Sequence, residues 1–569
     1  MEAATQVLVS ATSHIVLLLA LLPACGAVLV HLSRRAGGES VYYIAVTNAW
    51  TGQFLALMML FLFLSGTLHN DPVQQQANRL VSSLLWQCEI QSDTAISATA
   101  NAELTQRSQP RAALSGPPVR ILLGAGGINI WLIVLTVSVS VVFIQSQPHD
   151  HQRLRRRLAW ILLTESSLLV SIAALDLLLL SFSSLLSVVG LTFLIAEFGG
   201  RQRREAARRF FITQLTSGML LTIGLTGIAI SHWWMQVNRQ TQYPALSFSL
   251  TTVVEQIPKL AQSSQPALEY WNTLAPWLFL IIGAGIFIRL PIPPLHHGWM
   301  RVTEHADCRV VALIAVGYLP LSMQLLLRVI LPLFPEQSSA LAGHLAFWGV
   351  AGSLFLSFTA TTTQCRQRRL ATLALSVSTA AVGVSFLQQP TVIQGAALST
   401  VALAAACALA VLCRASSDEP LSSGRNRPTD SVIPAVILQW IPVVALAGLS
   451  LMPLTAGFWG ILLVLEGLFF FAPTLTLVLL ISYSLTGWTA HKELLTLRRI
   501  QTSPKQQSHA VSPADKPGTH RISLSTLIPL TIILAVISLC PRLVLDHLPV
   551  AGSDHRSRQM ETSQSTSTD

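Results

Sequence analysis

Long apolar segments constrain this chain more than any other feature. Fifteen mainly apolar runs recur along its 569 residues, most of them near the ~20 residues that a helix needs to cross a bilayer. The runs are 7–32, 41–67, 119–145, 158–174, 175–198, 210–234, 274–297, 310–334, 340–363, 370–388, 390–413, 431–452, 454–471, 473–489 and 523–545. Charged residues make up only 11% of the chain, whereas a soluble domain has about a quarter. The sequence therefore predicts an all-α, multi-pass membrane protein embedded in the lipid bilayer.

Short basic loops orient the predicted helices. Clusters follow the odd-numbered runs, at Arg34 and Arg35, Arg153 to Arg157, Arg201 to Arg209, Arg301 and Arg309, Arg366 to Arg369, and Arg414 to Arg427. Because basic loops mark the cytoplasmic face, we expect both termini to lie outside. The alternation persists only if 431–471 crosses once, as a helix broken around Pro453 and Gly457, which gives about fourteen crossings. The net charge of +10 then reflects topology, and no nucleic-acid partner is expected.

A second break is predicted from prolines. The run 274–297 contains Pro291, Pro293 and Pro294, which cannot all lie in an unbroken helix. Broken membrane helices persist where protein or a cavity satisfies the freed backbone groups, and they often mark an ion or substrate site. We therefore expect two discontinuous helices, in 274–300 and 431–471, packed inside the bundle.

One transmembrane domain is predicted over residues 1–545. It carries an outer polar loop at 68–118 and a cytoplasmic polar linker at 490–522, and the polar tail 546–569 is predicted to be disordered. The seven cysteines lack metal-ligand spacing, and Gly124-Ala-Gly-Gly lacks the strand-to-helix context of a nucleotide site. No metal, cofactor or catalytic residue is therefore expected in this chain.

Several motifs, in order, resemble one family. Arg289-Leu-Pro-Ile-Pro-Pro-Leu-His296 resembles the Lys-x-Pro-x-x-Pro-x-His motif of a broken seventh helix. Further similar stretches are Gly124 to Leu132, Asp176 to Gly200, Arg209 to Gln214, Leu326 to Pro335, Ile393 to Ala396, Leu454 to Gly460, and Cys540 to Asp546. The set resembles the antiporter-like membrane subunits of proton-pumping NADH:quinone oxidoreductase (respiratory complex I), above all the type M subunit.

The resemblance implies a proton path that this chain has mostly lost. In the family the path uses a glutamate on the fifth helix, lysines on the seventh and eighth, and a glutamate on the twelfth. Those positions fall here on Leu185, Arg289, Pro320 and Ile461, and an eleventh-helix histidine falls on Leu403. Since a guanidinium does not release its proton in proteins, Arg289 holds a charge without relaying one.

Five residues remain as proton-path candidates: Arg289, His296, His297, Glu165 and Glu466. Arg289 has an alternative role in a structural contact at the helix break, and the histidines in an interfacial position. Glu165 lies deep in its apolar run, and Glu466 follows Ile461 by five residues as a displaced replacement for the missing glutamate. Intramembrane ionisable residues are costly, so each is a functional candidate.

The sequence thus predicts a membrane subunit of a proton-translocating NADH:quinone oxidoreductase or a related complex, in a bacterial inner membrane. It would serve as a scaffold or conduct residually, beside other membrane subunits. Flavin and iron–sulfur clusters are expected on partner subunits. Two alternatives remain open: a component of an Mrp-like cation/proton antiporter, and a structural membrane subunit of another assembly.

Overall fold

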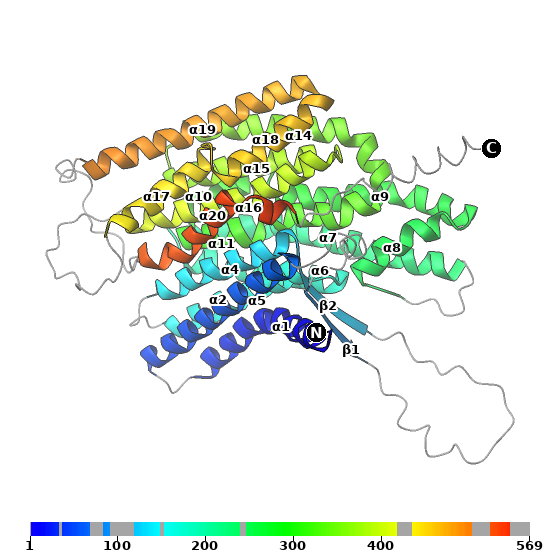
Figure 1. Cartoon of the computed structure of the whole chain (residues 1–569), viewed down its shortest axis with the longest axis horizontal. Coiled ribbons are helices and arrows are strands. Elements are labelled where there is room, and N and C mark those ends of the chain that lie inside the picture. Colours follow the sequence, from blue (N-terminus) through cyan, green and yellow to red (C-terminus); the bar gives the residue numbers. More distant parts are fainter. Residues whose placement is uncertain are drawn as a thin grey trace, which may run out of the picture.

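Helices dominate the computed structural model, which describes residues 2–33, 37–68, 84–90, 119–147, 153–238, 246–417, 435–502 and 524–546 (Figure 1). The first half contains α1 (Glu2–Leu32), α2 (Gly38–Leu68), β1 (Leu84–Ile90), β2 (Val119–Ala125), α4 (Ile128–Gln145), α5 (Leu154–Ala173), α6 (Leu177–Glu197), α7 (Arg203–Asn238), α8 (Leu250–Ala261) and α9 (Gln265–Arg289). The second half contains α10 (His297–His305), α11 (Cys308–Leu313), η2 (Ile314–Tyr318), α12 (Leu321–Leu325), η3 (Leu326–Ile330), α13 (Leu331–Leu333), α14 (Pro335–Thr362), α15 (Arg366–Ser385), α16 (Pro390–Ser417), α17 (Ala435–Leu449), α18 (Ala456–Phe471), α19 (Pro473–Thr502), η5 (Leu524–Leu527), α20 (Ile528–Leu539) and α21 (Arg542–Leu545).

The membrane fold predicted from the apolar runs is confirmed. Nine helices in the described part of the chain are long and apolar enough to cross a membrane. Helices α5, α15 and α19 are long but more polar, and α17, α18 and α20 are shorter apolar helices. If α11 to α13 count as one segment, α17 with α18 as another, and the short helices α8, α10 and α21 are left out, the described residues contain fourteen helical segments. The protein is a multi-pass integral membrane protein.

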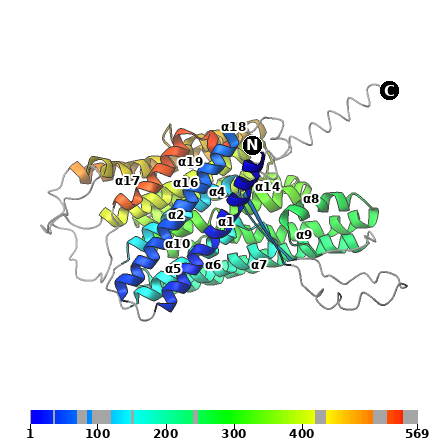
Figure 2. The same ribbon diagram turned by 60° about the horizontal axis from the view of Figure 1, so that its bottom comes forward.

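Three segments form the centre of the bundle. The apolar windows of α4 and of α11 to α13 are 94% buried, and that of α16 is 100% buried. By contrast, less than half of the corresponding windows of α1, α2, α7, α9 and α14 is buried, so those helices leave apolar faces for lipid or other chains. Figure 2 shows α16 and α4 crossing the middle of the molecule. Polar residues on these central helices therefore lie away from lipid.

The run 119–145 was predicted as one helix, and this prediction is wrong at its start. Residues Val119–Ala125 form β2, which pairs antiparallel with β1, and Leu84 faces Ala125 in the register. The helix α4 begins only at Ile128, because Gly126 and Gly127 interrupt the backbone, with Gly127 at φ 56°. The predicted outer loop 68–118 thus contains a strand at Leu84–Ile90, and residues 69–83 and 91–118 lie outside the described residues.

Two predicted polar segments contain helix. Residues 235–273, between two of the apolar runs, are expected from the alternation of basic loops to form an outer loop. Helix α8 lies within them: it begins after Ser249, whose hydroxyl accepts a hydrogen bond from the Thr252 amide, and it buries Leu250, Val253, Ile257 and Leu260. A search for runs of ~20 apolar residues misses such a short amphipathic helix. The linker predicted over 490–522 is helical as far as Thr502, and residues 503–523 lie outside the described part, as does nearly all of the tail 546–569.

The run 310–334 forms a helix with two π turns. The Leu319 amide donates to the Ile314 carbonyl, and the Leu331 amide donates to the Leu326 carbonyl, each five residues back. Each π turn ends shortly before a proline, Pro320 or Pro332. Proline lacks the amide donor and its ring crowds the carbonyl one turn earlier, so the helix widens there. The prolines were visible in the sequence, but the apolar run obscured their effect.

Candidate functional site

The first helix break lies where the prolines predicted it. Helix α9 ends at Arg289, α10 begins at His297, and the connecting residues include Leu290 and Ile292, which are buried. The indole Nε1 of Trp348 on α14 donates to the Pro293 carbonyl at 2.9 Å. A neighbouring helix thus satisfies part of the freed backbone, as a break in a membrane requires.

Arg289 lies at this break with no exposed surface. Its guanidinium donates to the Ser184 hydroxyl on α6 and lies over the Tyr318 ring of η2, 4.7 Å from the ring centroid. The Tyr318 hydroxyl in turn donates to Gln214 Oε1 on α7 at 3.0 Å. We call Arg289, Ser184, Gln214 and Tyr318 the Arg289 clasp. Within the described ranges no carboxylate forms an ion pair with Arg289.

The clasp contains no group that exchanges protons easily. Ser184 carries a hydroxyl, Gln214 an amide and Tyr318 a phenol, all of them neutral at physiological pH, and the guanidinium of Arg289 keeps its proton. Leu185, to which the resemblance assigns the position of a glutamate, is next to Ser184 and packs against α7 at Gly218. The clasp can therefore hold a positive charge in place, but it cannot pass a proton on.

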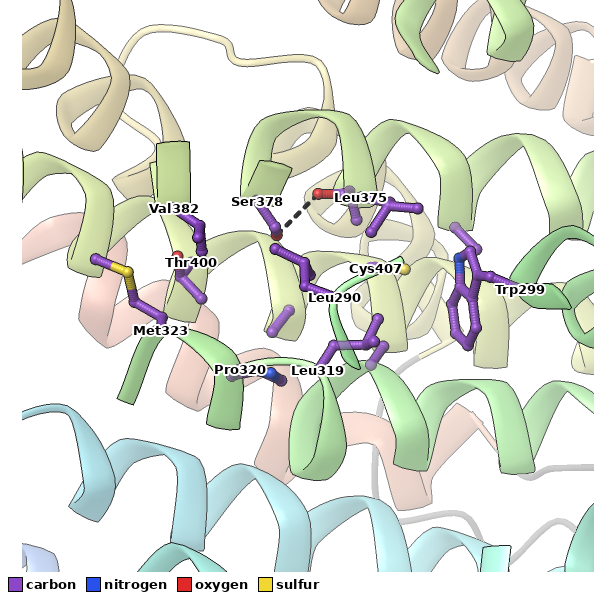
Figure 3. A pocket seen from close by; sticks show the side chains of 14 residues that line it. Leu290, Trp299, Leu319, Pro320, Met323, Leu375, Ser378, Val382, Thr400 and Cys407 are labelled. Carbon is purple, nitrogen blue, oxygen red and sulfur yellow. Dashed lines mark hydrogen bonds between the residues drawn. The ribbon is translucent and has the colours of Figure 1, made fainter. Parts of the chain in front are cut away.

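A small pocket borders Pro320, to which the resemblance assigns the position of the next lysine (Figure 3). Its lining is mostly apolar and comes mainly from four segments. Leu290 belongs to the first break, Leu319 to the π-turn segment, Val382 to α15 and Ala404 to α16. The Ser378 hydroxyl donates to the Ala374 carbonyl of its own helix at 3.0 Å. The lining residues that the structure describes include no Asp, Glu, Lys, Arg or His. The pocket is therefore a poor place for a proton relay.

The predicted histidines lie at the start of α10. His296 is buried, its ring centroid is 4.4 Å from that of His297, and its ring meets Phe355 of α14 edge-on. His297 is exposed. The same helix is tied to α15, because Arg368 pairs with Glu304 at 3.3 Å and Gln367 donates to the Ala306 carbonyl. Both histidines thus lie at the basic end of the break, close to each other.

Glu165 is buried at mid-helix on α5, with 1% of its surface exposed. Its neighbours Thr164 and Ser166 face α6 and α1: a Cβ on Gly190 would touch Thr164, and the Ser166 hydroxyl donates to the Ala20 carbonyl. The Oε2 atom of Glu165 has no hydrogen-bond partner in the part of the chain that the structure describes. Glu165 and Arg289 therefore form no ion pair with each other.

The second predicted break also exists, between Leu449 at the end of α17 and Ala456 at the start of α18. The Ser538 hydroxyl of α20 accepts a hydrogen bond from the Ala456 amide at 3.2 Å. Helix α18 packs closely on α16, since a Cβ on Gly460 would lie 2.7 Å from the Ser399 nitrogen. Ile461 and Leu403, to which the resemblance assigns the positions of a glutamate and a histidine, are both buried. This break is closed by small and apolar residues.

Glu466 lies on the outer face of α18 and is exposed. It shares that face with Trp459, Leu462, Phe469 and Phe470, which are exposed too. The structure thus brings His296 and His297 together, and it keeps Arg289, Glu165 and Glu466 apart on three different parts of the bundle. A path through the interior would not meet Glu466.

Sequence reasoning missed several polar residues of the interior. Ser184 is one of four serines between Ser181 and Ser187, and Gln214 follows Thr213, so nothing in the sequence distinguishes either from its polar neighbours. Tyr318 stands alone in an apolar run, where a hydroxyl attracts little notice. A second group was also missed, the buried hydroxyls of Ser353 and Ser357 on α14 with Ser482 and Thr486 on α19, joined at 2.8 to 2.9 Å. In that group the spacing of four residues on each helix was a usable signal, because such residues share one face.

The sequence matches a family and several relatives. The family described as "NADH:quinone oxidoreductase/Mrp antiporter, TM" matches residues 174–486. NADH-quinone oxidoreductase subunit M of Escherichia coli (strain K12) is 24% identical over 444 residues, which cover 75% of this chain and 81% of the relative. The subunit M of Pseudomonas aeruginosa is also 24% identical, over 456 residues, with 75% and 80% covered.

Solved structures share the fold. A chain of respiratory complex I from Thermus thermophilus with bound NADH has a TM-score of 0.63 at 18% identity, with 95% of this chain and 100% of that chain covered. A chain of the membrane-bound sulfane sulfur reductase, an archaeal respiratory membrane complex, has a TM-score of 0.64 at 13% identity, with 95% and 97% covered. A chain of the Mrp complex from Dietzia sp. has a TM-score of 0.61 at 14% identity, with 95% and 52% covered.

The family match extends from the start of α6 into α19, and it includes both breaks and more than half of the sequence. The chain therefore belongs to the NADH:quinone oxidoreductase/Mrp antiporter family of transmembrane subunits.

Proposed function

We propose that this chain is a membrane subunit of an NADH:quinone oxidoreductase, or of a related respiratory complex, in a bacterial inner membrane. Its role is that of a scaffold that does not leak protons. The named relatives are subunits of NADH-quinone oxidoreductases, and the similar structures come from multi-subunit membrane complexes. Flavin and iron–sulfur clusters would belong to partner subunits, and this chain would contribute the membrane part.

The Arg289 clasp carries this proposal. A proton that follows the route implied by the family resemblance would have to pass a permanently charged guanidinium, which is buried and has no carboxylate partner among the described residues. A fixed cation repels protons and other cations in a narrow polar passage. The side chain that stands in the family's lysine position thus acts as a barrier.

The remaining relay positions support the same conclusion. Leu185, Pro320 and Ile461 offer no titratable group, and the pocket beside Pro320 is largely apolar. An antiporter in which the chain itself moves cations would need ionisable groups at mid-membrane. Of the candidates, only Glu165 combines a carboxyl group with full burial near the middle of a crossing helix, and it stands alone.

Proton flux into vesicles tests the proposal. The purified full chain is reconstituted in liposomes with a pH-sensitive dye inside, and an imposed potential drives protons inward. We expect flux equal to that of empty vesicles, with an added protonophore as the positive control. Flux that Glu165→Gln abolishes would contradict the barrier and would indicate a route through Glu165. Flux that depends on sodium would favour the antiporter alternative.

A further inference from the structure

One acidic residue stands alone in a long apolar part of the sequence. Between Asp430 and Lys492, Glu466 is the only residue of the types Asp, Glu, Lys or Arg. It lies five residues before Phe471, the end of α18, which places it about 7.5 Å from that end. The turn that follows, through Ala472 to Pro473, is also apolar, so no polar loop lies next to the carboxyl group.

The exposed face around Glu466 is a continuous stripe. Trp459, Leu462, Glu466, Phe469 and Phe470 follow one another at intervals of three, four, three and one residues, which places them on one side of a helix. Leu462 is 43% exposed, Phe469 58% and Phe470 84%. We call these five residues the α18 outer stripe. Glu466 makes no hydrogen bond or ion pair with any residue that the structure describes.

The opposite face of α18 fixes this orientation. A Cβ on Gly460 would lie 2.7 Å from the Ser399 nitrogen, and one on Gly467 would lie 2.5 Å from Thr391 Oγ1, both on α16. Only glycine allows the two helices to approach so closely. Because α18 is held by these contacts, it cannot rotate to bring Glu466 into the bundle.

A carboxyl group that faces lipid at this depth is costly, and membrane proteins rarely keep one without a partner. The apolar remainder of the stripe suits another membrane helix, with large aromatic side chains that can pack against it. Charge complementarity then indicates what the neighbouring helix should place beside the Glu466 carboxylate: a cationic side chain or a strong hydrogen-bond donor at the same depth in the membrane. None of the described residues of this chain supplies such a group to Glu466.

We propose that the α18 outer stripe is the docking surface for a transmembrane helix of another membrane subunit, which presents a lysine or arginine to Glu466. The inference rests on the proposed function in one respect, since it requires that the chain works in a multi-subunit complex. It adds which face of the chain meets the partner and what the partner brings. It also assigns Glu466 a role outside any proton path.

The test compares Glu466→Leu with Glu466→Asp in the tagged full chain, expressed in its native membranes. For Glu466→Leu we expect co-purification of other membrane subunits to fall about tenfold, because truncating one side of a buried charge pair weakens an interface strongly. The melting temperature of the isolated chain should stay the same or rise, since a costly charge is removed. Glu466→Asp should keep most of the co-purification.

A photoreactive amino acid at position 462 supplies an independent readout. We expect an adduct with a different membrane polypeptide. Unchanged co-purification in Glu466→Leu, an adduct with lipid alone, or an adduct only with a second copy of this chain would each overturn the proposal. The vesicle experiment uses the isolated chain, so a failure of the barrier function and a failure of the docking surface give separate results.

Discussion

The two helix breaks of this protein solve the same backbone problem with different chemistry. Between α9 and α10 the chain keeps a buried cation and surrounds it with polar and aromatic groups from α6, α7 and η2. Between α17 and α18 it keeps no internal charge, and the joint is closed by Ser538 and by glycines packed on α16. The one acidic residue of that region, Glu466, faces outward.

The difference shows that a broken membrane helix does not by itself create an ion site. A break frees backbone groups, and either side chains or neighbouring helices can satisfy them. At the first break the Trp348 indole satisfies the Pro293 carbonyl, and the buried charge beside the break belongs to Arg289. At the second break close helix packing has replaced charge altogether.

The largest expected effect concerns the number of times that α17 and α18 together cross the membrane, once or twice. If α17 and α18 form one crossing, Asp150→Cys and His555→Cys lie on opposite faces, as the basic-loop pattern predicts. We expect a membrane-impermeant thiol reagent to label position 555 from outside and position 150 only after the membrane is opened. The background should carry serine at Cys25 and Cys540, which are exposed. Labelling of both positions from one side would mean that the segment crosses twice.

The next largest effect, a loss of thermal stability, is expected when an added side chain overpacks the second break. In Gly460→Leu the new side chain meets the backbone of α16 at Ser399, so one helix must shift, at a cost of about 3 kcal/mol. Thermal unfolding followed by size-exclusion chromatography measures the loss. Gly343→Leu on α14 is the matched control, because a Cβ there meets nothing within 4 Å. Equal melting temperatures for the two variants would show that the close approach of α16 and α18 is unimportant.

A smaller effect is expected at the first break. Tyr318→Leu removes both the ring under Arg289 and the hydroxyl that donates to Gln214, and should destabilise the chain by about 2 kcal/mol. Tyr318→Phe keeps the ring and should cost about 1 kcal/mol. The comparison of melting temperatures isolates the aromatic face. If the two variants melt together, the ring does not stabilise the guanidinium.

The fold was largely predictable, because the bilayer requires long apolar helices and the basic loops indicate how those helices are oriented across it. Both breaks followed from prolines and from charge alternation. The strand at Val119–Ala125 and the helix α8 were not predicted, since their apolar residues either merged with a longer run or formed only a short stripe. The π turns before Pro320 and Pro332 depend on local hydrogen bonding that hydropathy does not describe.

The candidate site was less predictable, because burial depends on helix rotation. Arg289 and Glu165 were identified in the sequence, and both are buried. The partners of Arg289 could not be named, since Ser184, Gln214 and Tyr318 come from three segments whose facing sides only the packed bundle defines. Glu466 was equally visible, but whether it points inward or outward depends on the glycines that press α18 against α16.

The smallest expected effect is the most informative about the first break. Arg289→Lys restores the family's residue type and introduces a side chain that can give up its proton. Proton transfer also needs a nearby carboxylate and a next acceptor, and Leu185 and Pro320 supply neither. We therefore expect the vesicle flux of Arg289→Lys to equal that of the unmodified chain. The double variant Leu185→Glu with Arg289→Lys should also remain at background, because the relay still ends at the apolar pocket beside Pro320 and at Ile461. Flux in the double variant alone would show that the first break needs only its ion pair to conduct. Flux in Arg289→Lys itself would show that the guanidinium was the sole barrier, and the bundle would then contain a water-filled route around Leu185 and Pro320.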